Sequence, residues 1–262
     1  MGIKSAVKGI LGEVNVFRLR EWKNGIFPNE FSRREKEDMT RRIAFYSGFI
    51  AQGDLCFDVG ANMGNRVAPM LAAGARVVAV EPQEFCQKVL RIKFGKKIEI
   101  VPMGLGPQDE VREMYISDAN YLSSFSTTWI DSVKKQRFSQ NSWNTVKKIQ
   151  MTTLDKLVEK YGAPAFIKID VEGFEIEVLS GLTRPAKLIS CEYTVPEQTD
   201  RAIACIRRIQ SFNPAIECNY SVGESMAFEM DKFIGVEDMI RLINTPEFIA
   251  TGFGDIYIRQ IS

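Results

Sequence analysis

Short apolar runs alternate with helix-length segments from residue 55 onward. Four of these runs, LCFDVG, RVVAVEP, IEIVPMG and AFIKIDVEG, end in polar or glycine-rich residues. Apolar strands separated by helix-length segments are typical of a parallel sheet with crossover helices. Ligands of such open sheets bind beyond the carboxyl ends of the strands, so we expect the four following loops to border one site. The pattern predicts an α/β core.

The chain on either side of this core has a different pattern. Residues 1–53 mix charged and apolar positions at helical spacing, and MTRRIAFYSGFIAQGD predicts a helix that ends at Gly53. We interpret residues 1–53 as an N-terminal helical cover on a single domain of residues 54–262. In the last third of the chain we expect helices over 200–212 and 236–242 and a terminal strand, DIYIRQI.

Residues 118–148 break the regular alternation of strands and helices. Long stretches of this kind are either functional or disordered, and the aromatic residues here argue against disorder. We interpret the stretch as a lid over the site. Trp129 and Trp143 could stack on a sugar ring or could hold the lid in place.

Composition and charge exclude several classes of protein. Lys and Arg total 34 against 33 Asp and Glu, so no overall field would attract nucleic acid. No sustained apolar run predicts a membrane span. The five cysteines are odd in number and lack a C-x-x-C pair, which fits reduced thiols in a cytoplasmic protein.

The segment FDVGANMGNRV follows the first predicted strand. Gly60 and Gly64 permit a tight turn, and a helix that begins near Asn65 would present free N–H groups to a phosphate or a carboxylate. A dinucleotide fingerprint would carry its second glycine where Asn62 stands, and the G-K-[ST] of a Walker loop is missing. Pyrophosphate ligands are therefore disfavoured.

An acidic residue, Glu81, lies 21 residues beyond Gly60, at the end of the second predicted strand. A carboxylate there can accept both hydroxyl protons of a ribose, which leaves NAD, adenosine and other nucleosides open. Combined with D-x-G-x-N-x-G, it points to S-adenosylmethionine, with the ligand carboxylate at the glycine turn and its ammonium group at Asp58. The predicted cofactor-binding residues are Asp58, Gly60, Ala61, Asn62, Gly64, Asn65, Glu81, Pro82 and Gly104.

A second signature, FIKIDVEGFEIEVLSG, carries charge inside a predicted strand. Lys168 and Asp170 are two residues apart, so they point to one face about 7 Å from each other. Glu172 follows in the turn. A core strand seldom carries two charges without a partner or a task. A catalytic role is favoured over an internal ion pair.

These segments together resemble the FkbM family of S-adenosylmethionine-dependent methyltransferases. The resemblance rests on FDVGANMGNRV, AVEPQ, SSFS, TTLDKLVEKYG and FIKIDVEGFEIEVLSG, in family order. It implies the Rossmann-like class I methyltransferase fold, a seven-stranded sheet of six parallel strands and one antiparallel terminal strand. It also implies O-methylation of a sugar, glycan or natural-product hydroxyl.

A hydroxyl acceptor must lose a proton, and the chain contains no histidine to take it. We expect Asp170 to be the base, Lys168 to orient it or to lower the alkoxide charge, and Glu172 to be the second candidate. These residues could instead hold the substrate or a divalent cation, although we expect no metal. Two other functions stay open, an NAD-dependent sugar oxidoreductase and a non-catalytic adenosine-binding scaffold.

Overall fold

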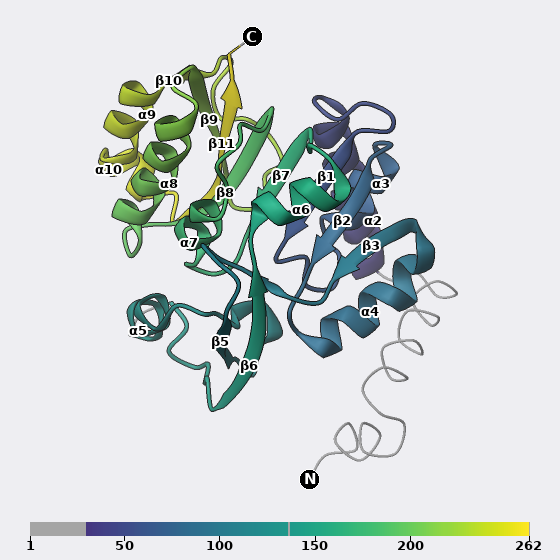
Figure 1. The fold of residues 1–262 in the computed structure, drawn as a ribbon. Coiled ribbons are helices and arrows are strands. Elements are labelled where there is room, and N and C mark those ends of the chain that lie inside the picture. The colour runs from purple at the N-terminus through teal and green to yellow at the C-terminus, as the bar shows by residue number, and fades with distance from the viewer. Residues whose placement is uncertain (1–29, 136, 262) are drawn as a thin grey trace, which may run out of the picture.

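A computed structural model describes residues 30–135 and 137–261 (Figure 1). The strands are β1 (Leu55–Val59), β2 (Arg76–Val80), β3 (Ile98–Val101), β4 (Gly104–Leu105), β5 (Val111–Ile116), β6 (Thr145–Thr152), β7 (Phe166–Ile169), β8 (Leu188–Thr194), β9 (Ile216–Val222), β10 (Ile234–Gly235) and β11 (Phe253–Gln260). The α-helices are α2 (Glu30–Ser47), α3 (Val67–Ala72), α4 (Glu84–Phe94), α5 (Thr127–Lys134), α6 (Leu154–Tyr161), α7 (Glu175–Ser180), α8 (Thr199–Phe212), α9 (Val236–Ile243) and α10 (Pro246–Ile249).

The main sheet has the strand order β10-β9-β11-β8-β7-β1-β2-β3. Strands β3, β2, β1, β7 and β8 pair in parallel, and β11 pairs antiparallel with both β8 and β9. β9 therefore runs in the same direction as β8, which gives six parallel strands and one antiparallel strand. This arrangement confirms the predicted class I methyltransferase fold. A short edge strand, β10, extends the predicted seven strands to eight.

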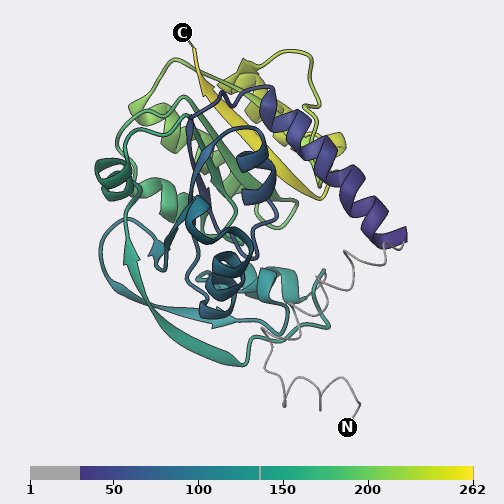
Figure 2. The same ribbon diagram turned by 90° about the vertical axis from the view of Figure 1, so that its right-hand side faces the viewer.

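Successive strand residues face opposite sides of the sheet, and each side carries its own core. Phe57 and Ile167 pack on one side with residues of α6, α7, α8 and α9. Cys56 and Phe166 pack on the other side with Tyr46 of α2 and with residues of α3 and α4. Figure 2 shows α2 lying along that second side beside β11. The central strands are therefore buried on both faces, as a parallel sheet covered by helices requires.

The described residues of the stretch, 118–135 and 137–148, pack around a small core of their own. Trp129 and Trp143 have 1% and 9% of their surface exposed and pack with Leu122, Ile130 and Val133. The indole Nε1 of Trp143 also donates to the Leu122 carbonyl at 2.7 Å. Both tryptophans thus help to hold the insertion together.

Three details differ from the sequence predictions. The helix expected to end at Gly53 ends at Ser47, where Gly48 begins a turn. The helix after the glycine turn begins at Val67 instead of near Asn65. A second, three-stranded sheet, β4-β6-β5, was not predicted, and it projects with α5 from one end of the main sheet (Figure 1).

Candidate active site

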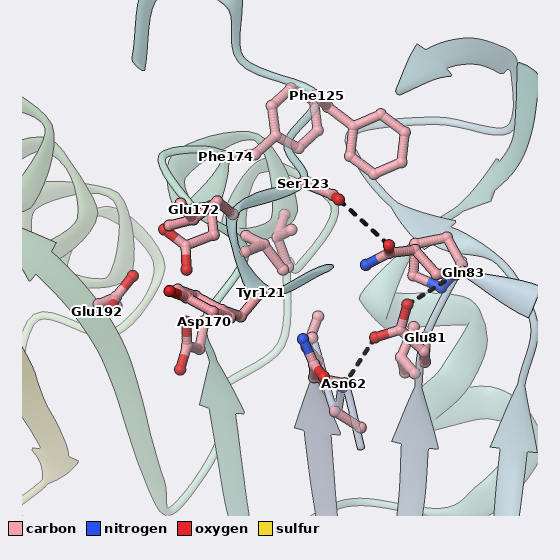
Figure 3. A pocket seen from close by; sticks show the side chains of 18 of the residues that line it. Asn62, Glu81, Gln83, Tyr121, Ser123, Phe125, Asp170, Glu172, Phe174 and Glu192 are labelled. Carbon is pink, nitrogen blue, oxygen red and sulfur yellow. Dashed lines mark hydrogen bonds between the residues drawn. The ribbon is translucent and has the colours of Figure 1, made fainter. Parts of the chain in front are cut away.

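The carboxyl ends of the central strands border a cavity of about 630 Å³. It is lined by residues that follow β1, β2, β3 and β7, by Glu192 and Thr194 of β8, and by residues of the insertion (Figure 3). Glu81 and Asp170, 89 positions apart in the chain, both line it. The predicted convergence of distant loops on one site is therefore confirmed.

The glycine turn after β1 lies directly against the end of β7. Gly60 has a φ of +86°, and a Cβ atom at this position would lie 1.8 Å from the carbonyl oxygen of Asp170. The amides of Gly60 and Ala61 both donate to the Val80 carbonyl, at 3.0 and 3.1 Å. Only glycine combines this backbone conformation with such a close approach.

Glu81 links the glycine turn to the end of β2 (Figure 3). Its carboxylate accepts the amide of Asn62 at 2.8 Å and the amide of Gln83 at 2.7 Å. The residue is 2% exposed. Burial raises the pKa of Glu81 to about 7, against the opposing effect of these two amide hydrogen bonds. Glu81 is thus a buried, oriented acceptor at the cavity wall.

Most of the predicted cofactor-binding residues line this cavity, namely Gly60, Ala61, Asn62, Asn65, Glu81, Pro82 and Gly104. Asp58 and Gly64 do not. Asp58 is 1% exposed and points to the α2 side of the sheet, where burial raises its pKa to about 6. Gly64 instead allows close packing, since a Cβ there would lie 2.3 Å from the ring of Phe94.

Lys168 lies beneath the cavity and does not line it. Its ammonium group is 2.8 Å from Asp170 Oδ2 and 3.3 Å from Asp255 Oδ1. The Lys168 and Asp255 side chains are 2% and 5% exposed, whereas that of Asp170 is 30% exposed. Lys168 therefore forms an internal ion pair with Asp255 and also holds Asp170, the one of its two partners that lines the cavity.

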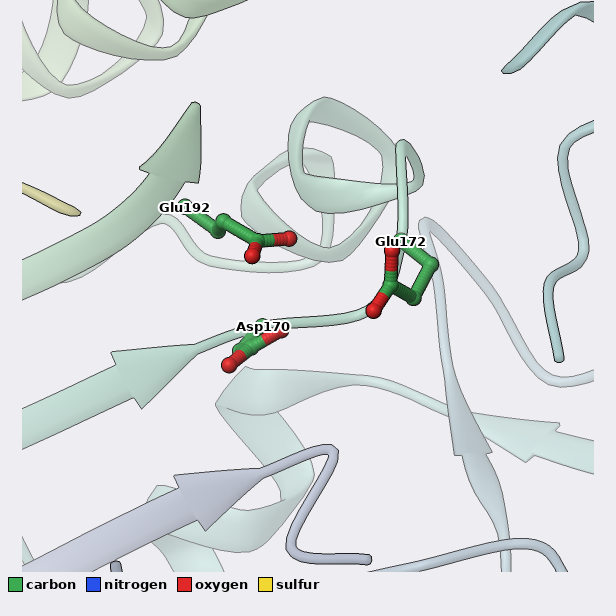
Figure 4. A group of neighbouring side chains, drawn as sticks. All are labelled: Asp170, Glu172 and Glu192. Carbon is green, nitrogen blue, oxygen red and sulfur yellow. The ribbon is translucent and has the colours of Figure 1, made fainter. Parts of the chain in front are cut away.

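Three carboxylates converge at the cavity floor (Figure 4). Asp170 follows β7, Glu172 lies in the next turn and Glu192 comes from β8; one carboxylate oxygen of each lies within 4.8 Å of the others. Glu192 is not among the predicted site residues, because no motif in the sequence marks it. Oxygen ligands at this spacing could hold a divalent cation, a proton or a substrate hydroxyl.

The charges in this cluster differ. Burial opposes ionisation of Asp170, but the charge and hydrogen bond of Lys168 outweigh it and lower the pKa of Asp170. Burial, and then the negative charge of Asp170, raise the pKa of Glu172 and Glu192 well above the ordinary range. The cluster therefore combines one ionised carboxylate with two that retain protons more readily.

The turn that carries Glu172 is held from both sides. Glu172 has a φ of +55°, in the left-handed region. Glu175 Oε1 accepts the amides of Val171 and Gly173, both at 3.1 Å, and Ser124 Oγ donates to the Glu172 carbonyl at 2.6 Å. These contacts fix a backbone conformation that a non-glycine residue rarely adopts.

The strand order and the loop-built cavity define a Rossmann-like fold with a ligand site beyond the carboxyl ends of its parallel strands. The family model described as "Methyltransferase FkbM domain" matches residues 58–235. The chain therefore belongs to the FkbM family and is an S-adenosylmethionine-dependent methyltransferase. This membership overrides the oxidoreductase alternative.

A search of curated proteins finds no match. Solved structures that resemble this chain include a TehB-like SAM-dependent methyltransferase from Corynebacterium glutamicum, with a TM-score of 0.46 and 8% identity over 95% of this chain and 98% of that one. The precorrin-6y C5,15-methyltransferase of Geobacter metallireducens has a TM-score of 0.45 and 10% identity, over 84% and 87% of the two chains. An O-methyltransferase from Bacillus cereus in complex with SAH has a TM-score of 0.41 and 12% identity, over 98% and 96%. Likenesses this distant carry no weight for substrate or chemistry.

Among residues 30–135 and 137–261, no helix combines the length and apolar character needed to cross a bilayer.

Proposed function

We propose that this methyltransferase is an O-methyltransferase that acts on a hydroxyl of a sugar, a glycan or a glycosylated natural product. The observation that carries the proposal is the carboxylate cluster of Asp170, Glu172 and Glu192 in the same cavity as Glu81 and the glycine turn. An alcohol is a weak nucleophile until a nearby base takes its proton, and these carboxylates supply that base.

The cavity residues fit S-adenosylmethionine. The buried Glu81 carboxylate can accept the ribose hydroxyls, and the missing Cβ of Gly60 lets the glycine turn pack directly against the end of β7, which brings the turn and Asp170 to one cavity. Pro82 and Gly104 provide small, apolar walls beyond Glu81. When bound, this cofactor supplies an already activated methyl group.

The three carboxylates accept and transfer the proton of the acceptor hydroxyl, and Lys168 positions Asp170 among them. Lys168 keeps Asp170 ionised, so that Asp170 can accept the hydroxyl hydrogen bond and draw the oxygen toward the cofactor site. Glu172 and Glu192, with their raised pKa values, are stronger bases once ionised and can relay the proton away from Asp170. Asp170 is thus the first proton acceptor and Lys168 its positioning residue.

Two exposed aromatic rings at the cavity support a sugar-containing acceptor. Tyr121 of the insertion is 60% exposed and Phe253 at the start of β11 is 41% exposed, and both line the cavity. Rings of this kind offer an apolar face for the C–H side of a sugar. A near-neutral chain with buried, unpaired cysteines is consistent with a cytoplasmic enzyme for such acceptors.

The test is mass spectrometry of glycans and small glycosylated metabolites from cells with and without the protein. We expect products heavier by the mass of one CH₂ group. Purified acceptor then allows turnover to be measured for Asp170→Asn, which should lose about 10²–10⁴-fold while still binding S-adenosylhomocysteine. Near-normal turnover would overturn the role of Asp170.

Two controls separate the alternatives. A rate that is unchanged by EDTA would exclude a divalent cation at the carboxylate cluster, as we expect. Binding of S-adenosylhomocysteine without methyl transfer to any acceptor would instead indicate the non-catalytic scaffold.

A further inference from the structure

Two arginine side chains meet at the cavity wall beside the glycine turn. Arg66 immediately follows the turn, Arg42 comes from α2, and both line the cavity. They share one carboxylate, that of Glu224, at 2.8 Å from Arg66 Nη1 and 3.1 Å from Arg42 Nη2. The arginine side chains are 10% and 17% exposed, whereas that of Glu224 is 53% exposed. The two guanidinium groups share a single carboxylate in direct contact, so one of the two positive charges has no contacting anion of its own. Asp58, Asp170 and Asp255 also act on the Arg66 charge without contacting it.

The arginine pair also has donors to spare. A guanidinium group carries five N–H donors. Arg66 holds Glu224 through both terminal nitrogens, Nη2 to Oε1 at 2.9 Å and Nη1 to Oε2 at 2.8 Å, and Nη1 has only the weakly accepting Met226 sulfur at 3.7 Å as a further neighbour. Arg42 Nε has no hydrogen-bond partner but is covered by protein atoms. Arg42 Nη1 also donates to the Asn65 carbonyl at 3.4 Å, which ties α2 to the glycine turn. Charge and donors together favour binding of one further anion.

The place of Arg66 and Arg42 in the cavity indicates which anion they bind. Glu81, which we assign to the ribose, accepts the amide of Asn62 in the middle of the glycine turn. Arg66 lies at the far end of the same turn. The helix that follows, α3, has only six residues, so its backbone is a poor source of positive charge. The guanidinium groups are therefore the positive charges that the cavity offers at the far end of the turn.

Given the proposed function, on which this inference rests, we propose that Arg66 and Arg42 bind the α-carboxylate in the amino-acid part of S-adenosylmethionine. Arg66 is the principal ligand because it directly follows the glycine turn, whereas Arg42 comes from α2. Arg42 adds a second contact and brings the N-terminal helix into the cofactor site. An acidic group on the acceptor has the same chemistry, and the experiment distinguishes the two sources.

The experiment compares two ligands by calorimetry. S-adenosylhomocysteine has the amino-acid part, whereas 5′-methylthioadenosine keeps the adenosine and the thioether and lacks it. Arg66→Gln should weaken S-adenosylhomocysteine about 10- to 100-fold and leave 5′-methylthioadenosine within about twofold. Arg66→Lys should recover part of the loss, and Arg42→Gln should give a smaller loss of the same kind. Arg91→Gln, an exposed position on α4, is the matched control.

Equal weakening of both ligands would show that Arg66 only supports the turn, and would overturn the inference. Unchanged binding of both would overturn it as well, and loss of turnover on an acidic acceptor would then assign the pair to the acceptor. If Arg66→Gln does not fold, the more exposed Arg42→Gln decides by the same comparison. Wild-type protein that binds neither ligand would overturn the proposed function itself, which is a different result.

Discussion

Replacing Lys168 by methionine tests the buried ion network beneath the cavity. Methionine fills a similar volume and removes the ammonium group that lies 3.3 Å from the 5%-exposed Asp255 and 2.8 Å from Asp170. At an effective dielectric constant of about 20, the Coulomb energy of the 3.3 Å pair is about 5 kcal/mol. Removing one partner of a buried pair typically costs about 3–5 kcal/mol, because the other charge is left without compensation. We expect a loss of that size.

The effect of pH on this loss has a definite sign. In the wild type, Lys168 keeps the pKa of Asp170 below its ordinary value. The stability that the Lys168–Asp170 pair contributes is therefore complete above about pH 4 and is lost as the pH falls through the native pKa of Asp170. In Lys168→Met the nearest opposing charge is gone and burial outweighs the remaining effects of Arg66 and Glu192, so the native pKa of Asp170 rises and the variant becomes less stable as the pH increases. The difference between the two proteins should therefore shrink as the pH falls from 7 toward 4.

Thermal and chemical unfolding at both ends of this pH range measure the difference. For a chain of this size, about 3–5 kcal/mol corresponds to a fall in Tm of about 6–20 °C. Lys156→Met is the matched control, because Lys156 pairs with Asp109 at the surface with 55% of its side chain exposed, and such pairs contribute about 0–1 kcal/mol. A loss below about 1 kcal/mol for Lys168→Met, or a loss that is equal at both pH values, would refute the reasoning.

Two further predictions concern the cofactor site. Gly60→Ala should abolish binding of S-adenosylhomocysteine, because the new Cβ would lie 1.8 Å from the Asp170 carbonyl oxygen. Gly53 is the matched control, because it has the same φ of +86° but nothing within 4 Å of the added Cβ. Gly53→Ala should therefore lower the stability by only about 1–2 kcal/mol and leave binding intact. Equal effects of the two substitutions would contradict the close-approach argument. The affinity for S-adenosylhomocysteine should rise several-fold between pH 6 and 8, because Glu81, with its pKa of about 7, ionises over this range. Glu81→Gln should remove this pH dependence. A wild-type affinity that does not change between pH 6 and 8 would contradict the role of Glu81.

Much of the fold could be predicted because local pattern and topology agree. Apolar runs that end in polar residues specify buried parallel strands, and parallel strands bring their carboxyl ends to one edge. This was enough to place Glu81, Asp170 and the glycine turn around one cavity. The second sheet was missed because β6 is mostly exposed and carries no alternating apolar pattern that would mark it as a strand.

The rest of the site depends on contacts between distant parts of the chain. Glu192 reaches the carboxylate cluster because β8 pairs with β7, and the sequence does not state which strands are neighbours. Arg66 and Glu224 are 158 positions apart in the chain, and only the folded structure brings them into contact. Asp58 shows the converse, since its motif suggests a ligand but the alternation along β1 turns its side chain to the buried α2 side. Strand parity could have indicated that outcome.

Calorimetry with S-adenosylhomocysteine at pH 8 determines whether the cavity between Glu81 and Asp170 holds S-adenosylmethionine. We expect saturable binding to the wild type that Glu81→Ala weakens at least about tenfold, while Glu84→Ala, three residues further on at the exposed start of α4, leaves it unchanged. Wild-type protein that does not bind, or that binds equally well after Glu81→Ala, would contradict it.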